Sequence, residues 1–202
     1  MSDEEGGAAR PYRMTRRAGQ VDDTRQRIVE ATVHIHETLG PARTTISGIA
    51  EAAGVTRLTV YRHFPDDEAL YEACSSHWQS AQVLPNLAAW AEIADSGARL
   101  TAGLTDLYRF YSDGRAMLAS IFGAAEHLPA GQRRRLHERQ TAIVGVLLSP
   151  FPKPGAQLRA VIGHAAGFST WHSLCIEEDL SNAQAVTVMS TLVIVTSGSG
   201  LA

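Results

Sequence analysis

The sequence predicts an all-α fold of about nine helices, and two observations lead to that prediction. Apolar residues recur at spacings of three and four along most of the chain, which is the period of an amphipathic helix. No stretch combines strand-like alternation with the turn residues of a hairpin. Residues 186–195 are rich in β-branched side chains and taken alone could form a strand, but no partner strand is available nearby, so a helix is predicted there too.

The composition indicates the class of protein. The chain has 202 residues, of which 45% are hydrophobic and 19% charged, as is typical of a globular protein with one compact domain or two small ones. Its formal net charge of −3 argues against binding nucleic acids by bulk attraction. The N-terminus is acidic and polar, no apolar run approaches the roughly 18 residues of a membrane span, and the two cysteines lie far apart. We expect a cytoplasmic protein with reduced thiols, no cofactor, no metal and no membrane partner.

The first segment, residues 1–20, lacks helical periodicity and is rich in Gly, Ala and Arg, which predicts a disordered basic arm. Between Arg10 and Arg27 there are six arginines and only two aspartates. Such a local excess of positive charge would be attracted to a phosphate backbone. A solvated tail without a binding role is the alternative, and the two interpretations are compatible.

A first helix is expected to begin near Asp22, because acidic residues are favourable at the positive end of a helix. Gly40-Pro41 is a typical stop signal and should end it. The residues expected on its buried face are Ile28, Ala31, Ile35 and Leu39.

The segment that begins at Thr45 has the pattern of two short helices around a tight corner. Thr45 is a suitable N-cap, and apolar residues follow it at spacings of three and four. Gly54 ends this helix at a position where a positive φ is expected. Thr56 can cap the second helix, which should bury Val60 and Phe64 and leave donors and aromatic edges on its other faces. This pattern is typical of the recognition helix of a helix-turn-helix.

At these residues the chain resembles the TetR family of bacterial transcriptional regulators. The resemblance consists of a Thr-led helix followed by three runs in register: Ala53-Gly54-Val55, Thr59-Val60-Tyr61-Arg62-His63-Phe64-Pro65 and Glu68-Ala69-Leu70. It covers about the first 80 residues, and further along only length and helical pattern agree. It implies a helix-turn-helix DNA-binding domain at 21–82 and a ligand-binding and dimerisation domain at 83–197. The polar tail, 198–202, is expected to be disordered.

The resemblance also implies a function. We expect a ligand-responsive DNA-binding transcriptional regulator, a repressor that forms a homodimer on a palindromic, double-stranded operator. A small apolar or aromatic effector, unidentified from the sequence, would release it. A DNA-bound scaffold or activator of the same fold, without a small-molecule effector, remains the alternative.

Carried over by position, the family pattern predicts which side chains contact DNA. Arg57 can grip a guanine edge, and Leu58 and the methyl group of Thr59 can touch a thymine methyl. Tyr61 and His63 resemble phosphate contacts, with packing in the core or at its edge as the alternative. For Arg62, solvent exposure is an equal alternative. The full predicted set is Thr45, Thr56, Arg57, Leu58, Thr59, Tyr61, Arg62 and His63.

Two departures from the family pattern bear on DNA binding. Many relatives have Gly where Leu58 stands, which implies a different base preference. Many also have a phosphate-binding Lys where Asp67 stands, so an attraction is lost and a repulsion is added. The basic arm could compensate for that loss.

The remaining helices follow from apolar stripes and breakers. Pro65-Asp66-Asp67 opens a helix that continues the head, and Pro85 to Gly97 contains a boundary. The Pro-rich run 149–155 is a loop. Further helices are expected at about 100–111, 117–125, 132–148, 157–176 and 182–196.

A dimer surface is expected because one helix-turn-helix reads only a few base pairs. The predicted helix 157–176 carries a smooth stripe of small residues, and the helix after it carries a matching apolar stripe. Packing of both stripes inside one protomer is the alternative. The predicted interface residues are Gly163, Ala166, Gly167, Thr170, Leu174, Ala185, Val188, Met189 and Leu192.

An effector pocket is predicted where aromatic and apolar residues cluster in the second half. Each of these residues could equally be plain core. The predicted pocket residues are Leu104, Tyr108, Tyr111, Met117, Ile121, Phe122, Phe168, Trp171 and His172.

An enzyme is the main alternative from another class. His172 and Cys175 lie three apart, close enough to share an ion, and His164, Glu177 and Glu178 are nearby. Two ligands do not make a zinc site, which needs three or four with defined spacing. Nucleophile-elbow, P-loop, HExxH and dinucleotide motifs are missing from the sequence, so no catalytic residues and no enzymatic activity are predicted.

Overall fold

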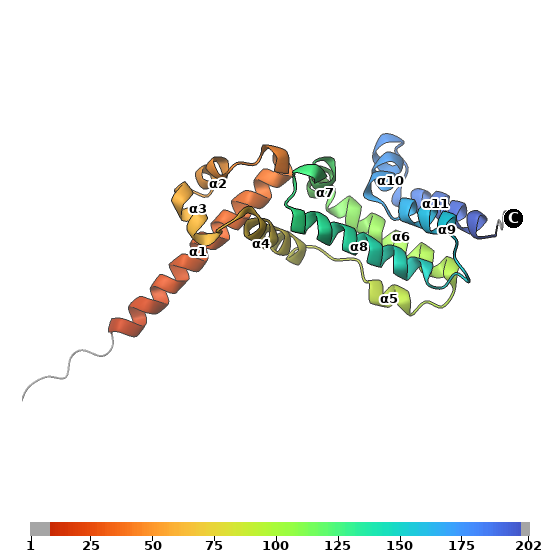
Figure 1. The fold of residues 1–202 in the computed structure, drawn as a ribbon, viewed down its shortest axis with the longest axis horizontal. Helices are drawn as coiled ribbons and strands as arrows, with labels where there is room; N and C mark the ends of the chain where they lie inside the picture. Colours follow the sequence, from red (N-terminus) through yellow and green to blue (C-terminus); the bar gives the residue numbers. More distant parts are fainter. Residues whose placement is uncertain (1–8, 199–202) are drawn as a thin grey trace, which may run out of the picture.

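The computed structural model describes the backbone of residues 9–198 and the side chains of residues 21–198. The described chain forms an elongated helical molecule, with the helix-turn-helix toward one end, where the N-terminal part of the first helix extends beyond it, and the last helix at the other end (Figure 1). It contains eleven α-helices and no strand within residues 9–198, which confirms the all-α prediction. Two of the additional helices are short ones, α5 (Leu87–Ala91) and α10 (Phe168–His172).

Four helices build the N-terminal head (Figure 1). Its buried core is a small cluster to which each of the four contributes, with Ile28, Ile49 and Val60 almost completely enclosed. The helices are α1 (Ala9–Thr38), α2 (Ile46–Ala52), α3 (Arg57–His63) and α4 (Asp67–Ser80).

The first helix is longer than the sequence predicted. It begins at Ala9, well before Asp22, so residues 9–20 continue α1 instead of forming an unstructured arm. Pro11 falls in the first turn, where backbone N–H groups have no intrahelical acceptor, so the missing N–H of proline removes no hydrogen bond. Most residues after it have good helix propensity. The expected disorder of residues 1–8 and 199–202 lies outside the described residues.

Seven helices form the C-terminal body. Its core is a larger cluster in which Leu104, Tyr108, Leu147 and Trp171 are almost completely buried. Gly103 allows α6 and α8 to approach, because a Cβ there would lie only 2.5 Å from Cδ2 of Leu147. The helices are α5, α6 (Ser96–Asp113), α7 (Arg115–Gly123), α8 (Ala130–Leu148), α9 (Ala156–Ala165), α10 and α11 (Asn182–Gly198).

The predicted helix 157–176 is broken in the structure. It splits at Ala166-Gly167 into α9 and α10, and a π-helical turn, Ser173–Glu177, follows. The break is stabilised because the hydroxyl of Tyr111 donates to the carbonyl of Ala166 (2.8 Å) and that of Thr170 donates to the carbonyl of His164 (2.6 Å). The stripe of small residues predicted for dimerisation is therefore not continuous. The last segment is helical, as predicted, despite its β-branched residues.

Arg99 joins three helices at the end of the body distant from the head. Its guanidinium is buried and donates to the carbonyl oxygens of Ala91 (2.8 Å), Ile93 (2.7 Å) and Val146 (3.2 Å), and to Oγ of Ser149 (2.6 Å). These acceptors follow or end α5 and α8, while Arg99 lies on α6. The charge is thus compensated by oxygen dipoles that the helix ends leave without intrahelical partners.

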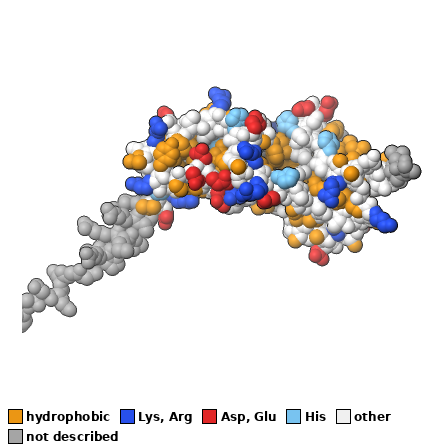
Figure 2. Space-filling model, in the orientation of Figure 1, with side chains coloured by type: hydrophobic (Ala, Val, Ile, Leu, Met, Phe, Trp, Pro, Cys, Tyr) orange, Lys and Arg blue, Asp and Glu red, His pale blue; other side chains and the backbone are white. Residues whose placement is uncertain are grey.

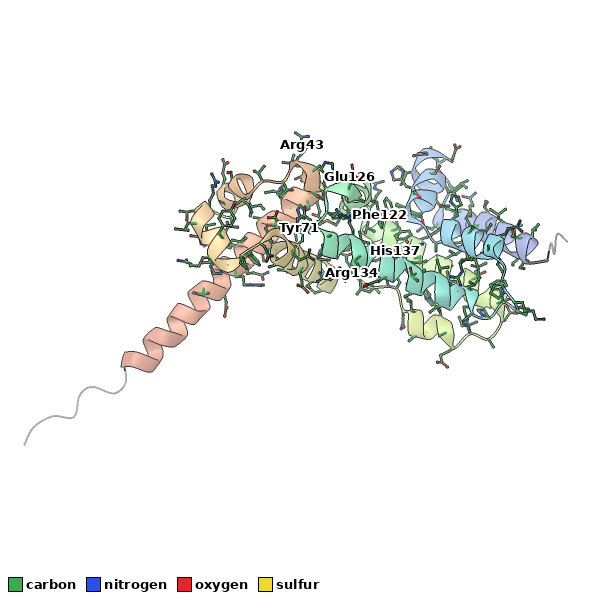
Figure 3. The ribbon with its side chains drawn as sticks, in the orientation of Figure 1. Arg43, Tyr71, Phe122, Glu126, Arg134 and His137 are labelled. Carbon is green, nitrogen blue, oxygen red and sulfur yellow. The ribbon has the colours of Figure 1, made fainter. Side chains whose placement is uncertain are left out.

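Head and body meet along α1, α4, α7 and α8. The backbone N–H of Gly131, in the first turn of α8, donates to the Glu68 carboxylate of α4 (3.2 Å). Arg135 reaches Glu72 of α4 at 3.3 Å. Tyr71 of α4 and Phe122 of α7 mark the two sides of this junction in Figure 3.

Candidate DNA-reading helix and ligand pocket

The corner between α2 and α3 has the geometry that the sequence predicted. Gly54 adopts a φ of 64°, in the left-handed region where a side chain is strained. The side chain of Thr45 accepts from the N–H of Gly48 (3.1 Å) and caps α2. That of Thr56 accepts from the N–H of Thr59 (3.2 Å) and caps α3. Both short helices therefore start at a satisfied cap and enclose a single fixed turn.

The recognition helix, α3, has a buried and an outward face. Val60 and the following Phe64 are buried against the head. Leu58 is 78% exposed and Tyr61 48%, although both are large and apolar. Arg57 and Arg62 are also exposed, while Thr59 and His63 are partly covered. An outward face of this kind, on the side of the head away from the body, can enter a groove of DNA without changing the fold (Figure 1).

Three of the predicted contacts, Thr56, Thr59 and His63, have a constrained chemistry. The hydroxyl groups of Thr56 and Thr59 lie 2.9 Å apart, so each is already engaged by the other. Partial burial, with the positive charges of Arg62 and Arg25 adding to it, lowers the pKa of His63 from its ordinary value. Its imidazole is therefore mostly neutral near pH 7 and acts as a hydrogen-bonding group more than as a cation.

Two arginines that the sequence assigned to the basic region support the head. Arg27 donates to the carbonyl of Ala53 at the helix-turn-helix corner (3.3 Å). The guanidinium of Arg25 lies 4.7 Å from the centre of the Phe64 ring. Elsewhere on the face of the head seen in Figure 2, acidic and basic side chains are mixed. Among residues 21–198, Arg25 and Arg27 thus bring positive charge to the head as individual side chains that pack against it.

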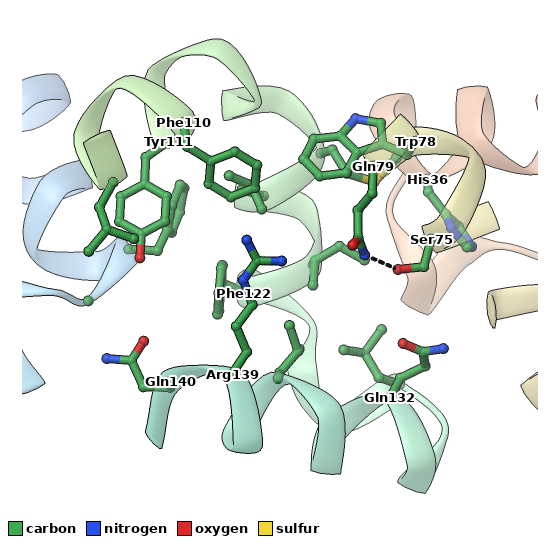
Figure 4. Close-up of a pocket in the computed structure, with 18 of the residues that line it drawn as sticks. His36, Ser75, Trp78, Gln79, Phe110, Tyr111, Phe122, Gln132, Arg139 and Gln140 are labelled. Carbon is green, nitrogen blue, oxygen red and sulfur yellow. Dashed lines mark hydrogen bonds between the residues drawn. The ribbon is translucent and has the colours of Figure 1, made fainter. Parts of the chain in front are cut away.

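A cavity of about 420 Å³ lies where the head meets the body. Its walls come from α1, α4, α6, α7, α8 and the start of α10, and they are mainly aromatic and aliphatic (Figure 4). Aromatic rings line one side: Phe122 stacks on Phe168 with ring centres 5.1 Å apart, and Tyr111 meets Phe168 edge to face at 5.5 Å. Its volume and lining are those of a small-molecule site.

The structure divides the predicted pocket residues into two groups. Tyr111, Met117, Ile121, Phe122 and Phe168 line the cavity. The other four do not. Of these, Leu104, Tyr108 and Trp171 are core residues, buried between α6 and the last helices. The hydroxyl of Tyr108 donates to the carbonyl of Ala165, and the indole N–H of Trp171 donates to Oδ1 of Asn182 (both 2.9 Å). The polar groups of these two side chains therefore have partners inside the protein. His172 turns to Glu177 instead (3.3 Å).

The sequence analysis missed two walls of the cavity. One belongs to the head, which supplies side chains from α1 and α4: His36, Tyr71, Cys74, Ser75, Trp78 and Gln79. The other is one face of α8: Gln132, Leu136, Arg139, Gln140 and Ile143. The α8 residues recur with helical spacing and form one face of apolar and amide side chains with a single cation, Arg139. That pattern was the signal in the sequence from which this wall of the cavity could have been predicted.

Comparisons with known proteins support the assignment of the head. Residues 28–74 match the family model described as bacterial regulatory proteins, tetR family. The HTH-type transcriptional regulator TtgR of Pseudomonas putida is 43% identical over 54 residues, and the nucleoid occlusion factor SlmA of Marinobacter nauticus is 37% identical over 54. These matches cover 27% of this chain and 26% and 28% of the two relatives, so the chain matches about a quarter of the relatives' length.

Similarity to solved structures extends over most of the fold. A tetR-family transcriptional regulator from Streptomyces coelicolor has a TM-score of 0.60 and 21% identity, covering 88% of this chain and 82% of that one. NalD, the secondary repressor of the MexAB-OprM multidrug efflux pump in Pseudomonas aeruginosa, has a TM-score of 0.55 and 18% identity, covering 88% and 96%. At these identities the likeness concerns the fold. The head, residues 28–74, therefore matches the TetR family, and most of the chain shares the fold of TetR-family structures.

The predicted dimer residues fall into three groups by exposure. Ala166, Thr170, Ala185 and Met189 are at most 5% exposed within one protomer, so they pack inside it. Gly163, Gly167 and Leu174 are partly exposed. Val188 and Leu192 lie on the outer face of α11, 48% and 47% exposed, and Val195, which the sequence analysis did not include, is 60% exposed next to them.

Other kinds of site find little support in the described residues. Residues 21–198 contain no group of three or more His, Cys, Asp or Glu side chains that could hold a metal ion. Cys74 is buried and Cys175 partly buried, and both are free thiols. Burial raises the pKa of the Cys175 thiol above its ordinary value, which disfavours the reactive thiolate. No described helix combines the length and hydropathy of a membrane span.

Proposed function

We propose that this chain is a DNA-binding transcriptional regulator of the TetR family whose operator affinity is controlled by a small molecule. The observation that carries the proposal is the outward face of α3. Arg57 and Leu58 extend from a helix whose opposite side is fixed in the core by Val60 and Phe64. Exposing a leucine to 78% has no benefit for folding, whereas it can contact thymine methyl groups in a major groove.

Dimerisation on a palindromic operator is the second part of the proposal. The face of α11 that carries Val188, Leu192 and Val195 is exposed in the single protomer, and Ala160 of α9 is exposed as well. Exposed apolar surface of this kind favours association with a second copy. Two heads held at a fixed separation can read half-sites about 34–36 Å apart.

Release by an effector is the third part. The cavity is bordered by head residues such as Tyr71 and Trp78 and by body residues such as Phe122. A molecule bound there would touch both units, so its affinity must depend on how they are arranged. If it binds better to a conformer whose heads do not fit adjacent grooves, it lowers operator affinity by population shift.

Selection of binding sites from a random duplex library by the full-length chain tests the proposal. We expect a palindrome. Arg57→Ala should weaken binding to it by about 1–3 kcal/mol and broaden the choice at one base in each half-site, with little effect on random DNA. Arg115→Ala, which removes an exposed charge from α7, is the matched control and should bind as the wild type does. Recovery of no preferred sequence, or equal binding by Arg57→Ala, would contradict the DNA-reading role of α3. Operator affinity that no small molecule changes would instead leave a DNA-bound scaffold.

A further inference from the structure

Arg139 lines the cavity and lacks the hydrogen-bond or ion-pair partners that the other arginines of α8 have within the described residues. Arg139 extends from α8 toward Phe110, with Gln132 and Gln140 on the same helix to either side (Figure 4). Its guanidinium carbon lies 5.4 Å from the centre of the Phe110 ring. Within the described residues it makes no hydrogen bond or ion pair, although a guanidinium carries five N–H donors.

The other arginines of the same helix are all engaged. Arg133 donates to the carbonyl of Leu128 (2.7 Å). Arg134 lies 3.8 Å from Glu138, and Arg135 lies 3.3 Å from Glu72. The contrast follows from position, because these three lie outside the cavity whereas Arg139 lines it. The missing partner of Arg139 is therefore a feature of the cavity itself.

The walls of the cavity contain no negative charge that could compensate Arg139. None of the residues that line it is Asp or Glu, and its surface is mostly aromatic and aliphatic. Burial lowers the pKa of Arg139 from its ordinary value, yet a guanidinium remains protonated near neutrality. An uncompensated cation in such surroundings carries a desolvation cost, which a bound anion would offset.

A second donor in the cavity, two helical turns from Arg139 on α8, also lacks a partner. Gln132, one of the lining residues, is 8% exposed, and its Nε2 has no hydrogen-bond partner within the described chain. His36 lines the end of the cavity next to the head, but burial lowers its pKa to about 4, so it is neutral at pH 7. The cavity thus offers one fixed positive charge and one unused amide donor on α8.

We propose that the effector of this cavity is an organic monoanion, a carboxylate on an apolar body, whose carboxylate pairs with Arg139. The inference rests on the proposed sensory function and names its ligand class. A planar carboxylate can accept two parallel N–H bonds from the guanidinium, while the apolar body lies between Trp78, Phe110 and Phe122. A second charge on the ligand would have no partner, so one anionic group is expected. The cavity, at about 420 Å³, suits a body of roughly drug size.

Titration calorimetry of the full-length chain without DNA tests the ligand class. One set of probes has an aromatic body and differs in charge: 1-naphthylacetate, 1-naphthylacetamide and 2-(1-naphthyl)ethylamine. A second set has an aliphatic body: decanoate, decanamide and decylamine, below their micellar concentrations. We expect the anion of at least one set to bind roughly 10- to 100-fold more tightly than its neutral and cationic analogues. The set that binds more tightly distinguishes an aromatic from an aliphatic body.

Variants locate the anion. Arg139→Gln should remove the preference for the anion, and Arg139→Lys, which keeps the charge but not the two-pronged geometry, should retain part of it. Arg134→Gln, a solvent-facing change on the same helix, is the control and should bind as the wild type does. Thermal melts verify that each variant is folded. Equal binding of the neutral analogues, unchanged anion binding by Arg139→Gln, or no binding of either anion at millimolar concentration overturns the inference.

The inference and the proposed function can fail separately. Calorimetry without DNA measures only how the affinity for a ligand depends on the charge of that ligand. Operator release is measured apart from it, by fluorescence anisotropy of labelled operator DNA with and without the anion that binds. An anion that binds through Arg139 but leaves operator affinity unchanged would support the ligand class and contradict the sensory role.

Discussion

Oγ of Ser120 donates a 2.6 Å hydrogen bond to the backbone carbonyl of His36. The contact connects α7 of the body to the last turn of α1 in the head. Carbonyl groups in the last turn of a helix have no intrahelical partner, so the hydroxyl satisfies an acceptor that would otherwise be unpaired in a partly buried site. Ser120 also lies beside Gly40, where a Cβ would be 3.1 Å from its Oγ. The body therefore helps to fix the end of α1.

Ser120→Ala is expected to destabilise the chain. The comparison is with Ser112→Ala on α6, an exposed helical serine, because both changes gain the same helix propensity. Ser120→Ala should be less stable than Ser112→Ala by about 1 kcal/mol, the usual contribution of one partly buried hydrogen bond. Chemical denaturation of the two variants measures the difference. Equal stability would mean that water replaces the hydroxyl group without loss.

His36 is expected to make stability depend on pH. Burial lowers its pKa from 6.5 to about 4 in the folded chain, so the unfolded state binds the proton more tightly. Above pH 6.5 the protonation of His36 does not lower the free energy of unfolding. As the pH falls from 6.5 toward 4, the unfolded state takes up the proton and the free energy of unfolding decreases. Between pH 7.5 and 5 the loss should be about 2 kcal/mol. Denaturation curves at several pH values measure the slope. It should flatten in His36→Gln and persist in His34→Gln, which alters an exposed histidine of the same helix.

Gly54→Ala is expected to strain the corner between α2 and α3. At a φ of 64° a Cβ is unfavourable, so the variant should lose about 1–2 kcal/mol of stability. Gly145→Ala is the matched control, because Gly145 is exposed inside α8 and a Cβ there would meet no atom within 4 Å. That change should raise stability by up to about 1 kcal/mol through helix propensity. Thermal and urea unfolding of both variants give the sign of each effect. A stabilised Gly54→Ala would contradict the assigned corner geometry.

Leu192→Glu is expected to prevent dimerisation. Leu192 lies on the exposed apolar face of α11, where a charge would be buried between two copies without a partner. Light scattering after size-exclusion chromatography should then give a monomer mass, with the helical circular dichroism of the wild type. Val83→Glu alters another exposed apolar residue, 73% exposed and distant from α11 in sequence, and should leave the mass unchanged. A dimeric Leu192→Glu would locate the interface elsewhere.

The structure of the head could be predicted because its main features depend on residues close together in the sequence. The caps at Thr45 and Thr56 and the positive φ of Gly54 all follow from short-range sequence patterns, and each is present in the structure. Which faces of α3 are buried also followed from the spacing of Val60 and Phe64.

The body was predicted less completely because its features depend on contacts between distant segments. The break at Ala166-Gly167 is stabilised by the hydroxyl of Tyr111, 55 residues earlier, so the sequence 157–176 gave little sign of it. Tyr108 and Trp171 looked like ligand contacts, yet their polar tips are used inside the core. Arg139 was not among the predicted pocket residues, because only the packing of α6 and α7 against α8 encloses it.

The position of Arg99 has a mechanical consequence. One guanidinium holds backbone or side-chain oxygens near the ends of α5 and α8 and is itself carried by α6, so these three helices are cross-linked at the end farthest from the head. Sliding any one of them there would leave a buried charge without its acceptors. We therefore expect that end to act as a fixed anchor. Displacement caused by an occupied cavity should appear at the opposite end, as a tilt of α4 and the head that it carries.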